Sequence, residues 1–206
     1  MKNENPTRKH PRLKGYDYSQ NGAYFITICV NVGRDVPGAP HILGRIVGDD
    51  VRDVPICELS DYGRIVEKRI EEMNGVYDDM NVEKYVIMPN HIHLIICVNT
   101  DGGTSRTPSP TNAKIPGFIS TFKRFTNKEC GISIWQRSYH DRIIRNDEEY
   151  LRIWKYIDEN PIRWTEDQYY NVGDGVLDVP HDRNDNAPDT ATVGRDAPIA
   201  QDIINT

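Results

Sequence analysis

This sequence of 206 residues lacks the apolar stretches that would indicate a membrane protein or a secreted one. No apolar run approaches the ~20 residues that a membrane-spanning helix needs. The richest stretch, Val86–Val98, is interrupted by a proline, an asparagine and two histidines. The first segment, Met1–Arg12, is polar and basic and lacks the apolar core of a secretion signal. We therefore expect a cytoplasmic protein with no membrane partner.

The four cysteines stand far apart, at positions 29, 57, 97 and 130, and form no Cys-x-x-Cys pair. This spacing excludes the usual zinc and disulfide frameworks. Cys29 and Cys97 lie inside apolar, strand-like runs, which is typical of buried free thiols in a reducing compartment. We expect no small-molecule cofactor.

The net charge of −6 argues at first against a nucleic-acid partner, since proteins that bind phosphate are usually basic. The charge is unevenly distributed, however. Residues 171–206 hold seven aspartates against two arginines, a net charge of −5. We predict a basic arm over 1–16, a catalytic domain over 17–165 and an acidic, flexible tail over 166–206. Within the domain, 32–55 is predicted to be an insertion and 99–113 a linker loop.

The order of elements follows from hydrophobic periodicity. Residues 24–30, 82–88 and 91–98 are rich in β-branched and aromatic residues and predict strands, the last two joined by a tight turn at Pro89-Asn90. Residues 42–47 and 55–59 predict a short accessory hairpin. Helical spacing predicts helices over about 61–74, 115–128 and 147–160, and residues 135–145 are predicted to be extended. The sum is an α+β, ferredoxin-like β-α-β-β-α-β antiparallel sheet with helices on one face, the other face open, and a C-terminal helix.

Two histidines on one predicted strand are candidate metal ligands. In the strand 91–98, Ile92, Leu94 and Ile96 share one face, so His91 and His93 share the other, about 7 Å apart by strand rise. Two imidazoles on a rigid strand are well placed to hold one metal ion. The alternative is a pair of surface histidines on an open sheet face, and the spacing alone leaves both open.

The last predicted helix carries a tyrosine outside its apolar stripe. Tyr156 lies about 110° from the centre of that stripe by helical geometry, with Asn160 one turn ahead and Arg152 one turn behind. A phenol followed at i+4 by an amide is a candidate reactive pair. The alternative is an amphipathic tyrosine at the edge of the helix, with its hydroxyl in water.

Three strings, in order, make the chain similar to a known family. They are Tyr85-Val-Ile-Met-Pro-Asn-His-Ile-His-Leu-Ile96, Ile134-Trp-Gln-Arg-Ser-Tyr-His-Asp-Arg-Ile-Ile-Arg145 and Tyr156-Ile-Asp-Glu-Asn-Pro161. Together they resemble the REP-associated tyrosine transposases, within the single-tyrosine HUH transposases, over roughly residues 15–164. The resemblance implies a DNA endonuclease and strand-transferase that acts on single-stranded or hairpin-bearing DNA. It implies His91 and His93 as ligands of Mg²⁺ or Mn²⁺, Asn160 as a third ligand, and Tyr156 as the nucleophile that forms a 5′-phosphotyrosine.

Basic residues near these motifs are candidate phosphate contacts, with a solvated helix face as the alternative for each. They are Arg12, Lys14, Lys123, Arg124, Lys128, Arg137, Arg142 and Arg152. Trp135 or Tyr139 is a candidate for stacking on a base, although Trp135 also fits a core position. If Tyr156 were not the nucleophile, Tyr139 or Tyr150 would be the next candidates. The second hypothesis for function is a non-catalytic nucleic-acid-binding module on the same sheet, and the sequence leaves monomer and dimer undecided.

Overall fold

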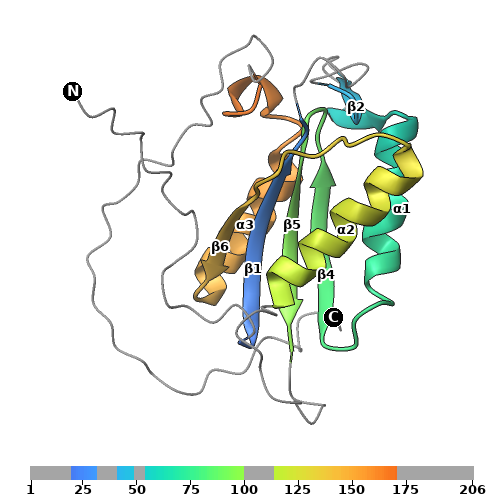
Figure 1. Cartoon of the computed structure of the whole chain (residues 1–206). Helices are drawn as coiled ribbons and strands as arrows, with labels where there is room; N and C mark the ends of the chain where they lie inside the picture. The colour runs from blue at the N-terminus through green and yellow to red at the C-terminus, as the bar shows by residue number, and fades with distance from the viewer. Residues whose placement is uncertain (1–19, 32–40, 49–53, 100–113, 171–206) are drawn as a thin grey trace, which may run out of the picture.

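The computed structural model describes residues 20–31, 41–48, 54–99 and 114–170 (Figure 1). The predictions for the basic arm, the linker loop, most of the insertion and the acidic segment beyond 170 lie outside these residues. The main element of the fold is a four-stranded antiparallel sheet with strand order β4-β5-β1-β6. The strands are β1 (Gly22–Cys29), β4 (Met80–Ile87), β5 (His91–Val98) and β6 (His140–Ile144). This order is that of a ferredoxin-like fold, as the sequence predicted.

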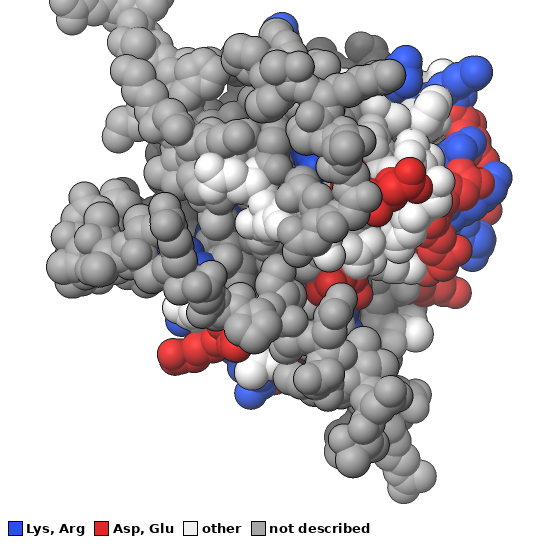
Figure 2. Space-filling model, turned by 90° about the horizontal axis from the view of Figure 1, so that it is seen from below, with Lys and Arg blue, Asp and Glu red and all other residues white. Residues whose placement is uncertain are grey.

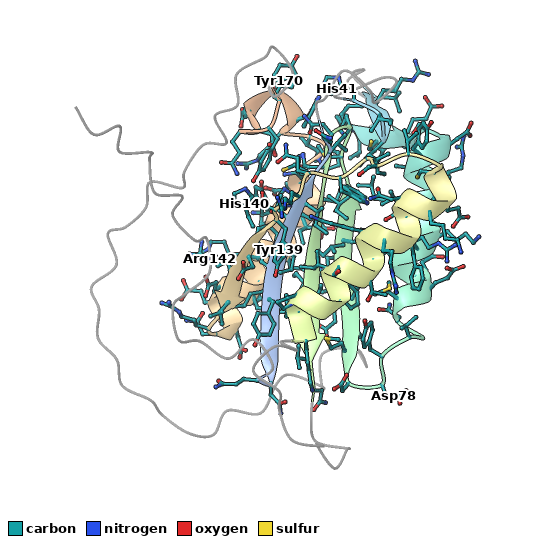
Figure 3. All side chains as sticks on the ribbon, viewed as in Figure 1. His41, Asp78, Tyr139, His140, Arg142 and Tyr170 are labelled. Carbon is teal, nitrogen blue, oxygen red and sulfur yellow. The ribbon has the colours of Figure 1, made fainter. Side chains whose placement is uncertain are left out.

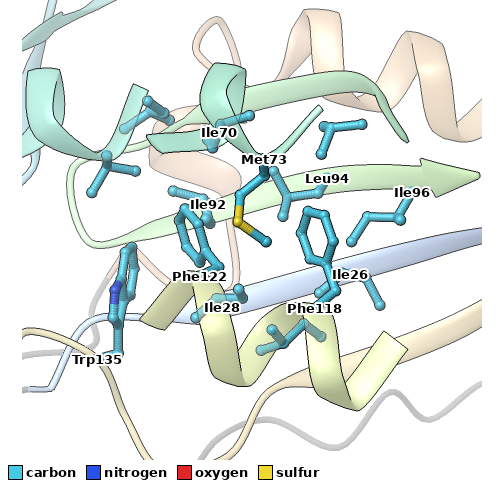
Figure 4. Packing of buried hydrophobic residues seen from close by; sticks show 14 of the residues in the cluster. Ile26, Ile28, Ile70, Met73, Ile92, Leu94, Ile96, Phe118, Phe122 and Trp135 are labelled. Atoms are coloured by element: carbon cyan, nitrogen blue, oxygen red, sulfur yellow. The ribbon is translucent and has the colours of Figure 1, made fainter. Parts of the chain in front are cut away.

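Two helices cover one face of the sheet, α1 (Asp61–Met73) and α2 (Lys114–Cys130). Ser60 begins α1 because its side-chain oxygen accepts a hydrogen bond from the Gly63 N–H at 3.1 Å. Phe118 and Phe122 of α2 meet Leu94 of β5 in the main core (Figure 4). No helix of the described part combines the length and the apolarity required to cross a bilayer.

The expectation that the second sheet face is open is wrong, because the helix α3 (Asp147–Glu159) covers it (Figure 1). Ile153 and Ile157 of α3 form a second core with Ile95 of β5 and Ile144 of β6. Periodicity predicts that α3 has an apolar stripe, but it does not say against which surface the stripe packs. The Asn146 side chain caps the start of this helix by accepting from the Glu149 N–H at 2.8 Å. The cap is therefore Asn146, one residue before the predicted start of the helix at 147.

The accessory hairpin is confirmed as a separate two-stranded sheet of β2 (Gly44–Val47) and β3 (Ile56–Leu59). It is held against α1 where the chain just before β2 approaches the start of the helix. The Ser60 N–H donates to the Leu43 carbonyl at 2.9 Å, and a Cβ at Gly63 would lie 2.1 Å from that same oxygen. Only a glycine at this position lets the chain before β2 pass so close to α1.

Replacing Gly63 by alanine is therefore expected to destabilise the fold by about 1–3 kcal/mol, the usual cost of overpacking a tight contact. Gly117 is the matched control, because it also lies in a helix and a Cβ there would meet no atom within 4 Å. Its replacement by alanine is expected to stabilise the protein by about 0.4–1 kcal/mol. Urea unfolding of both variants measures the difference, and equal stabilities would show that the hairpin is not fastened through Leu43.

Candidate metal and nucleophile site

The two histidines of β5 lie side by side on the face that α3 covers. The Nε2 atoms of His91 and His93 are 3.0 Å apart. Both side chains are buried, with exposed fractions of 0% and 1%, so the alternative of two surface histidines is wrong. Phe25 of β1 stacks on the His93 ring at 5.1 Å between centroids. The spacing predicted the pair, but not its burial.

Each imidazole has a partner on its second nitrogen. Asn90 Oδ1 lies 2.8 Å from His91 Nδ1, and Thr27 Oγ1 lies 2.8 Å from His93 Nδ1. Thr27 stands opposite His93 in the β1–β5 register. Such outer contacts hold ligand rings in one orientation and leave the Nε2 atoms facing a common point. The sequence analysis missed Thr27, which is 66 residues from His93.

The environment keeps both imidazoles uncharged, which is the charge state in which imidazole binds metals. Burial lowers the pKa of His93 to about 3. Burial also lowers the pKa of His91 well below its ordinary value, and the neighbouring His93 contributes in the same direction. Neutral imidazole is the ligand form, so no net proton has to leave either ring near neutral pH when a cation binds.

Tyr156 lies next to this pair because α3 packs on the same face of the sheet. Its hydroxyl lies 3.3 Å from His93 Nε2, and its ring meets Phe25 edge-on at 6.0 Å. The side chain keeps an exposed fraction of 38%, so one side of the phenol faces outward. Helical spacing predicted that Tyr156 lies outside the apolar stripe of α3. Because that stripe packs on β5, the side chain of Tyr156 lies beside the histidines.

The alternative nucleophile Tyr150 occupies a different place. Its hydroxyl donates to the Glu83 carboxylate of β4 and its ring contacts Trp154. Burial, followed by the bond to Glu83, raises the pKa of this phenol. A phenol that already donates to a carboxylate and resists ionisation is a poor nucleophile, so the geometry favours Tyr156 over Tyr150.

A carboxylate that the sequence analysis missed completes the group. Asp167 Oδ2 accepts from Asn160 Nδ2 at 3.0 Å and lies 3.5 Å from the Tyr156 hydroxyl. Ligand atoms of Asp167, His91 and His93 all lie within 4.8 Å of one another, an arrangement that can hold a metal ion. Burial raises the pKa of Asp167, opposed by its hydrogen bonds to Tyr169, Asn160 and Tyr156.

Asn160 shows how the group fits a cation. Its side-chain nitrogen is used by Asp167, whereas its Oδ1 is buried and has no hydrogen-bond partner among the described residues. An orphaned buried oxygen costs free energy unless something binds it. Amide oxygen is a ligand that Mg²⁺ and Mn²⁺ accept. The side chains present therefore fit a divalent cation.

The segment 164–170 covers the His91 side of the site. Trp164 and Tyr169 place their rings 6.0 Å and 4.6 Å from the His91 ring. Asn90 Nδ2 donates to the Tyr169 carbonyl at 2.7 Å. Tyr170, beside His41 at the same end of the molecule, extends this aromatic cluster outward through Trp164 (Figure 3). Sequence reasoning assigned 166–170 to the acidic tail, because aspartates are abundant in residues 171–206.

The predicted phosphate contacts have different environments. Arg12 and Lys14 lie outside the described residues. Lys123 Nζ donates to the carbonyls of Gln136 and Ser138 at 2.9 and 2.8 Å, and burial lowers its pKa to about 8. Its ammonium group therefore holds a loop of the protein. Trp135, a stacking candidate, has an exposed fraction of 4% and belongs to the core.

The other candidates are more accessible. Arg142 extends outward from β6 (Figure 3) and pairs with Glu149 at 2.7 Å, which also lies 4.0 Å from Arg152. Arg124, Lys128 and Arg137 are exposed. Figure 2 shows acidic and basic side chains interleaved along the edge formed by α1, where salt bridges run between neighbouring residues. That edge is not a uniformly basic surface.

Comparison with known proteins shows to which of them the chain is related. No protein-family model matches it. An uncharacterised protein of Haemophilus influenzae is 31% identical over 181 residues, which cover 79% of this chain and 93% of that protein. The chain belongs to the same family as this Haemophilus protein. The similarity extends over nearly the whole length of the relative.

A solved structure has a fold similar to that of this chain. A REP-associated tyrosine transposase bound to a REP hairpin aligns with 74% of this chain and 73% of its own, with a TM-score of 0.50 and 19% identity. This likeness shows that the chain shares the fold of that transposase, which is the fold that the resemblance of the three sequence strings implied.

Proposed function

We propose that this protein is a DNA endonuclease and strand-transferase that cleaves single-stranded or hairpin-bearing DNA through Tyr156. One observation carries the proposal: α3 brings the phenol of Tyr156 within 3.3 Å of a buried, neutral histidine pair on β5. The fold of a transposase whose solved structure holds a REP hairpin supports DNA as the partner.

We propose that His91 Nε2, His93 Nε2 and Asn160 Oδ1 hold one divalent cation, Mg²⁺ or Mn²⁺. A cation bound there would neutralise charge on the phosphate oxygens during cleavage. Imidazole alone also suits zinc, so the amide oxygen is the part of this donor set that favours Mg²⁺ or Mn²⁺. Asp167 adds a negative charge beside the cation and orients Asn160 through the 3.0 Å bond to its nitrogen.

The covalent step uses the phenol of Tyr156 as nucleophile. Its Oη forms a bond to phosphorus while the bond from phosphorus to the 3′ oxygen breaks, which leaves a 5′-phosphotyrosine and a free 3′-hydroxyl. Asp167 Oδ2, at 3.5 Å, is the carboxylate oxygen placed to receive the phenol proton, and the leaving 3′ oxygen takes up a proton from solvent. Because the new bond is an ester like the old one, attack by another 3′-hydroxyl reverses the step and joins strands.

DNA has to reach a site that the segment 164–170 covers. The exposed side of Tyr156 gives an approach to the phenol, whereas Trp164 and Tyr169 lie over His91. We propose that the accessible cations contact the phosphates of the strand. They are Arg124, Lys128 and Arg137, with Arg142 and Arg152 in addition. Binding through such contacts weakens steeply as salt rises.

The proposal is tested by incubating the full chain with labelled, hairpin-bearing single strands and Mn²⁺. A denaturing gel is expected to show a protein–DNA adduct that survives detergent and requires the cation. Binding that depends on salt, with no cleavage under any divalent cation, would overturn the proposal and favour a non-catalytic nucleic-acid-binding module.

Removing the amide ligand tests the donor set separately. Asn160→Ala is expected to lower the affinity for Mn²⁺ by at least about tenfold, the lower end of what loss of even a supporting contact costs a metal site. Asn160→Asp, which keeps an oxygen at the same position, should retain binding. Isothermal titration without DNA measures both, and wild-type affinity in the alanine variant would remove Asn160 from the ligand set and leave Asp167 as the third ligand.

A further inference from the structure

The hydrogen bonds around the histidine pair form a closed ring, and one of them fixes its direction. Asn90 Nδ2 donates to the Tyr169 carbonyl at 2.7 Å, and a carbonyl can only accept. Asn90 therefore turns its oxygen toward His91, 2.8 Å from Nδ1. An amide oxygen can only accept as well, so His91 carries its proton on Nδ1 and has a lone pair on Nε2.

The state of His93 follows from that of His91. Two imidazoles buried this completely are neutral, because a charged ring would lose its hydration, so each ring has one N–H. The two Nε2 atoms are 3.0 Å apart, and two lone pairs at that distance would repel. Since His91 Nε2 holds a lone pair, the N–H between the rings belongs to His93 Nε2. His93 Nδ1 then holds a lone pair, which accepts from the Thr27 hydroxyl at 2.8 Å.

Thr27 also contacts the residue that closes the ring. Its hydroxyl lies close enough to interact with the side chain of Tyr169, the residue whose carbonyl orients Asn90. While Thr27 donates to His93, it has to accept from the Tyr169 hydroxyl. Without a cation, every polar atom in this ring has a partner, and His93 is in the tautomer that cannot bind a metal through Nε2.

We propose that Thr27 is a positioning residue that sets the tautomer of His93 and reverses its hydroxyl when a cation binds. The inference rests on the proposed function, in which both Nε2 atoms are ligands. To become one, His93 has to lose the proton on Nε2 and gain one on Nδ1. The ring stays neutral, and no net proton is released.

The reversal needs a group that both donates and accepts. Once Nδ1 carries the proton, it donates to Thr27 Oγ1, and the Thr27 O–H turns toward the Tyr169 oxygen. The Tyr169 O–H then has to turn away from Thr27. A hydroxyl at position 27 makes both arrangements, and serine has the same group. Valine has the shape of threonine but can do neither, which would leave the Nδ1–H of a metal-bound His93 buried and unpaired.

The test compares Thr27→Val with Thr27→Ser in the full chain, by isothermal titration with Mn²⁺ in the absence of DNA. The valine variant is expected to bind Mn²⁺ about 10–100-fold more weakly, as other losses of an outer contact do, and serine is expected to restore the affinity. Thr126→Val is the matched control, because Thr126 is equally buried but bonds to the Phe122 carbonyl and to Trp135 in the main core. Its affinity for Mn²⁺ should stay that of the wild type.

Nitrogen NMR of histidine side chains in the wild-type protein reads the tautomer directly, even if the valine variant fails to fold. We expect His93 to change from Nε2–H to Nδ1–H when Mg²⁺ is added, while His91 stays Nδ1–H. An unchanged His93 in a protein that binds Mg²⁺, or valine and wild-type proteins of equal affinity, would overturn the role of Thr27. A wild-type protein that binds neither cation would instead refute the metal site of the proposed function.

Discussion

A Tyr156→Phe protein is expected to form no detectable DNA adduct, a loss of at least about 10³-fold, since removing a nucleophile leaves the rest of a site with little catalysis of its own. The change deletes one oxygen, the atom that lies 3.3 Å from His93 Nε2. The ring contact with Phe25 does not involve that oxygen and should persist. Mn²⁺ affinity should also persist, because the phenol is not among the proposed ligands. A denaturing gel and a titration measure the two effects.

Tyr150→Phe is the matched control for that variant. Tyr150 lies on the same helix, but its hydroxyl bonds to Glu83 at the β4 edge of the sheet. The control protein is expected to form the adduct at a rate close to that of the wild type. The opposite pattern, with adduct in Tyr156→Phe and none in Tyr150→Phe, would move the nucleophile to Tyr150.

Loss of the histidine pair is expected to have the second large effect. His93→Ala removes a proposed ligand and the ring next to the phenol, so adduct formation should fall by more than about a hundredfold, beyond the range for an outer contact. Removing the cation from the wild-type protein with EDTA should have the same effect, and added Mn²⁺ should reverse it only in the wild type. Adduct that forms equally well in EDTA would contradict metal dependence.

His140→Ala serves as the control for the histidine variant. His140 begins β6, an edge strand of the sheet, where it stands opposite Thr27 in the β1–β6 register, and it is not part of the metal-binding group found in the described residues (Figure 3). Its replacement should leave both Mn²⁺ affinity and adduct formation near those of the wild type. A loss equal to that of His93→Ala would indicate that the variants act through stability, which thermal unfolding of both proteins would show.

Local sequence patterns were enough to predict the helices and strands and the two pairs of residues that form the site. Period-2 alternation put His91 and His93 on one face of β5, and helical spacing put Tyr156 and Asn160 on one side of α3. Both patterns are properties of short stretches of chain. That the two halves meet depends on α3 packing against Ile95 of the second sheet face. This contact is tertiary, and the sequence reasoning expected that face to be open.

The residues that were missed or given another role are those without a reliable local signal. Thr27 is an ordinary strand residue, and only the register of β1 against β5 places it opposite His93. Asp167 stands shortly before an aspartate-rich stretch, where composition favours a solvated tail over a buried carboxylate. Lys123 has a helical position typical of an exposed cation, yet two backbone carbonyls hold its ammonium group. The role of each of these residues depends on a partner distant in sequence or on the geometry of a loop. Residue spacing along the chain predicts neither distant partners nor loop geometry.

The measurement that tests the account most directly is the identification of the attached residue. Wild-type adduct formed on a hairpin-bearing strand with Mn²⁺ is digested with nuclease and protease, and the modified peptide is sequenced by mass spectrometry. We predict a nucleotide linked through its 5′-phosphate to Tyr156. A 3′-phosphate linkage, attachment to another residue, or no attached nucleotide in a sample that cleaves DNA would contradict the proposed mechanism.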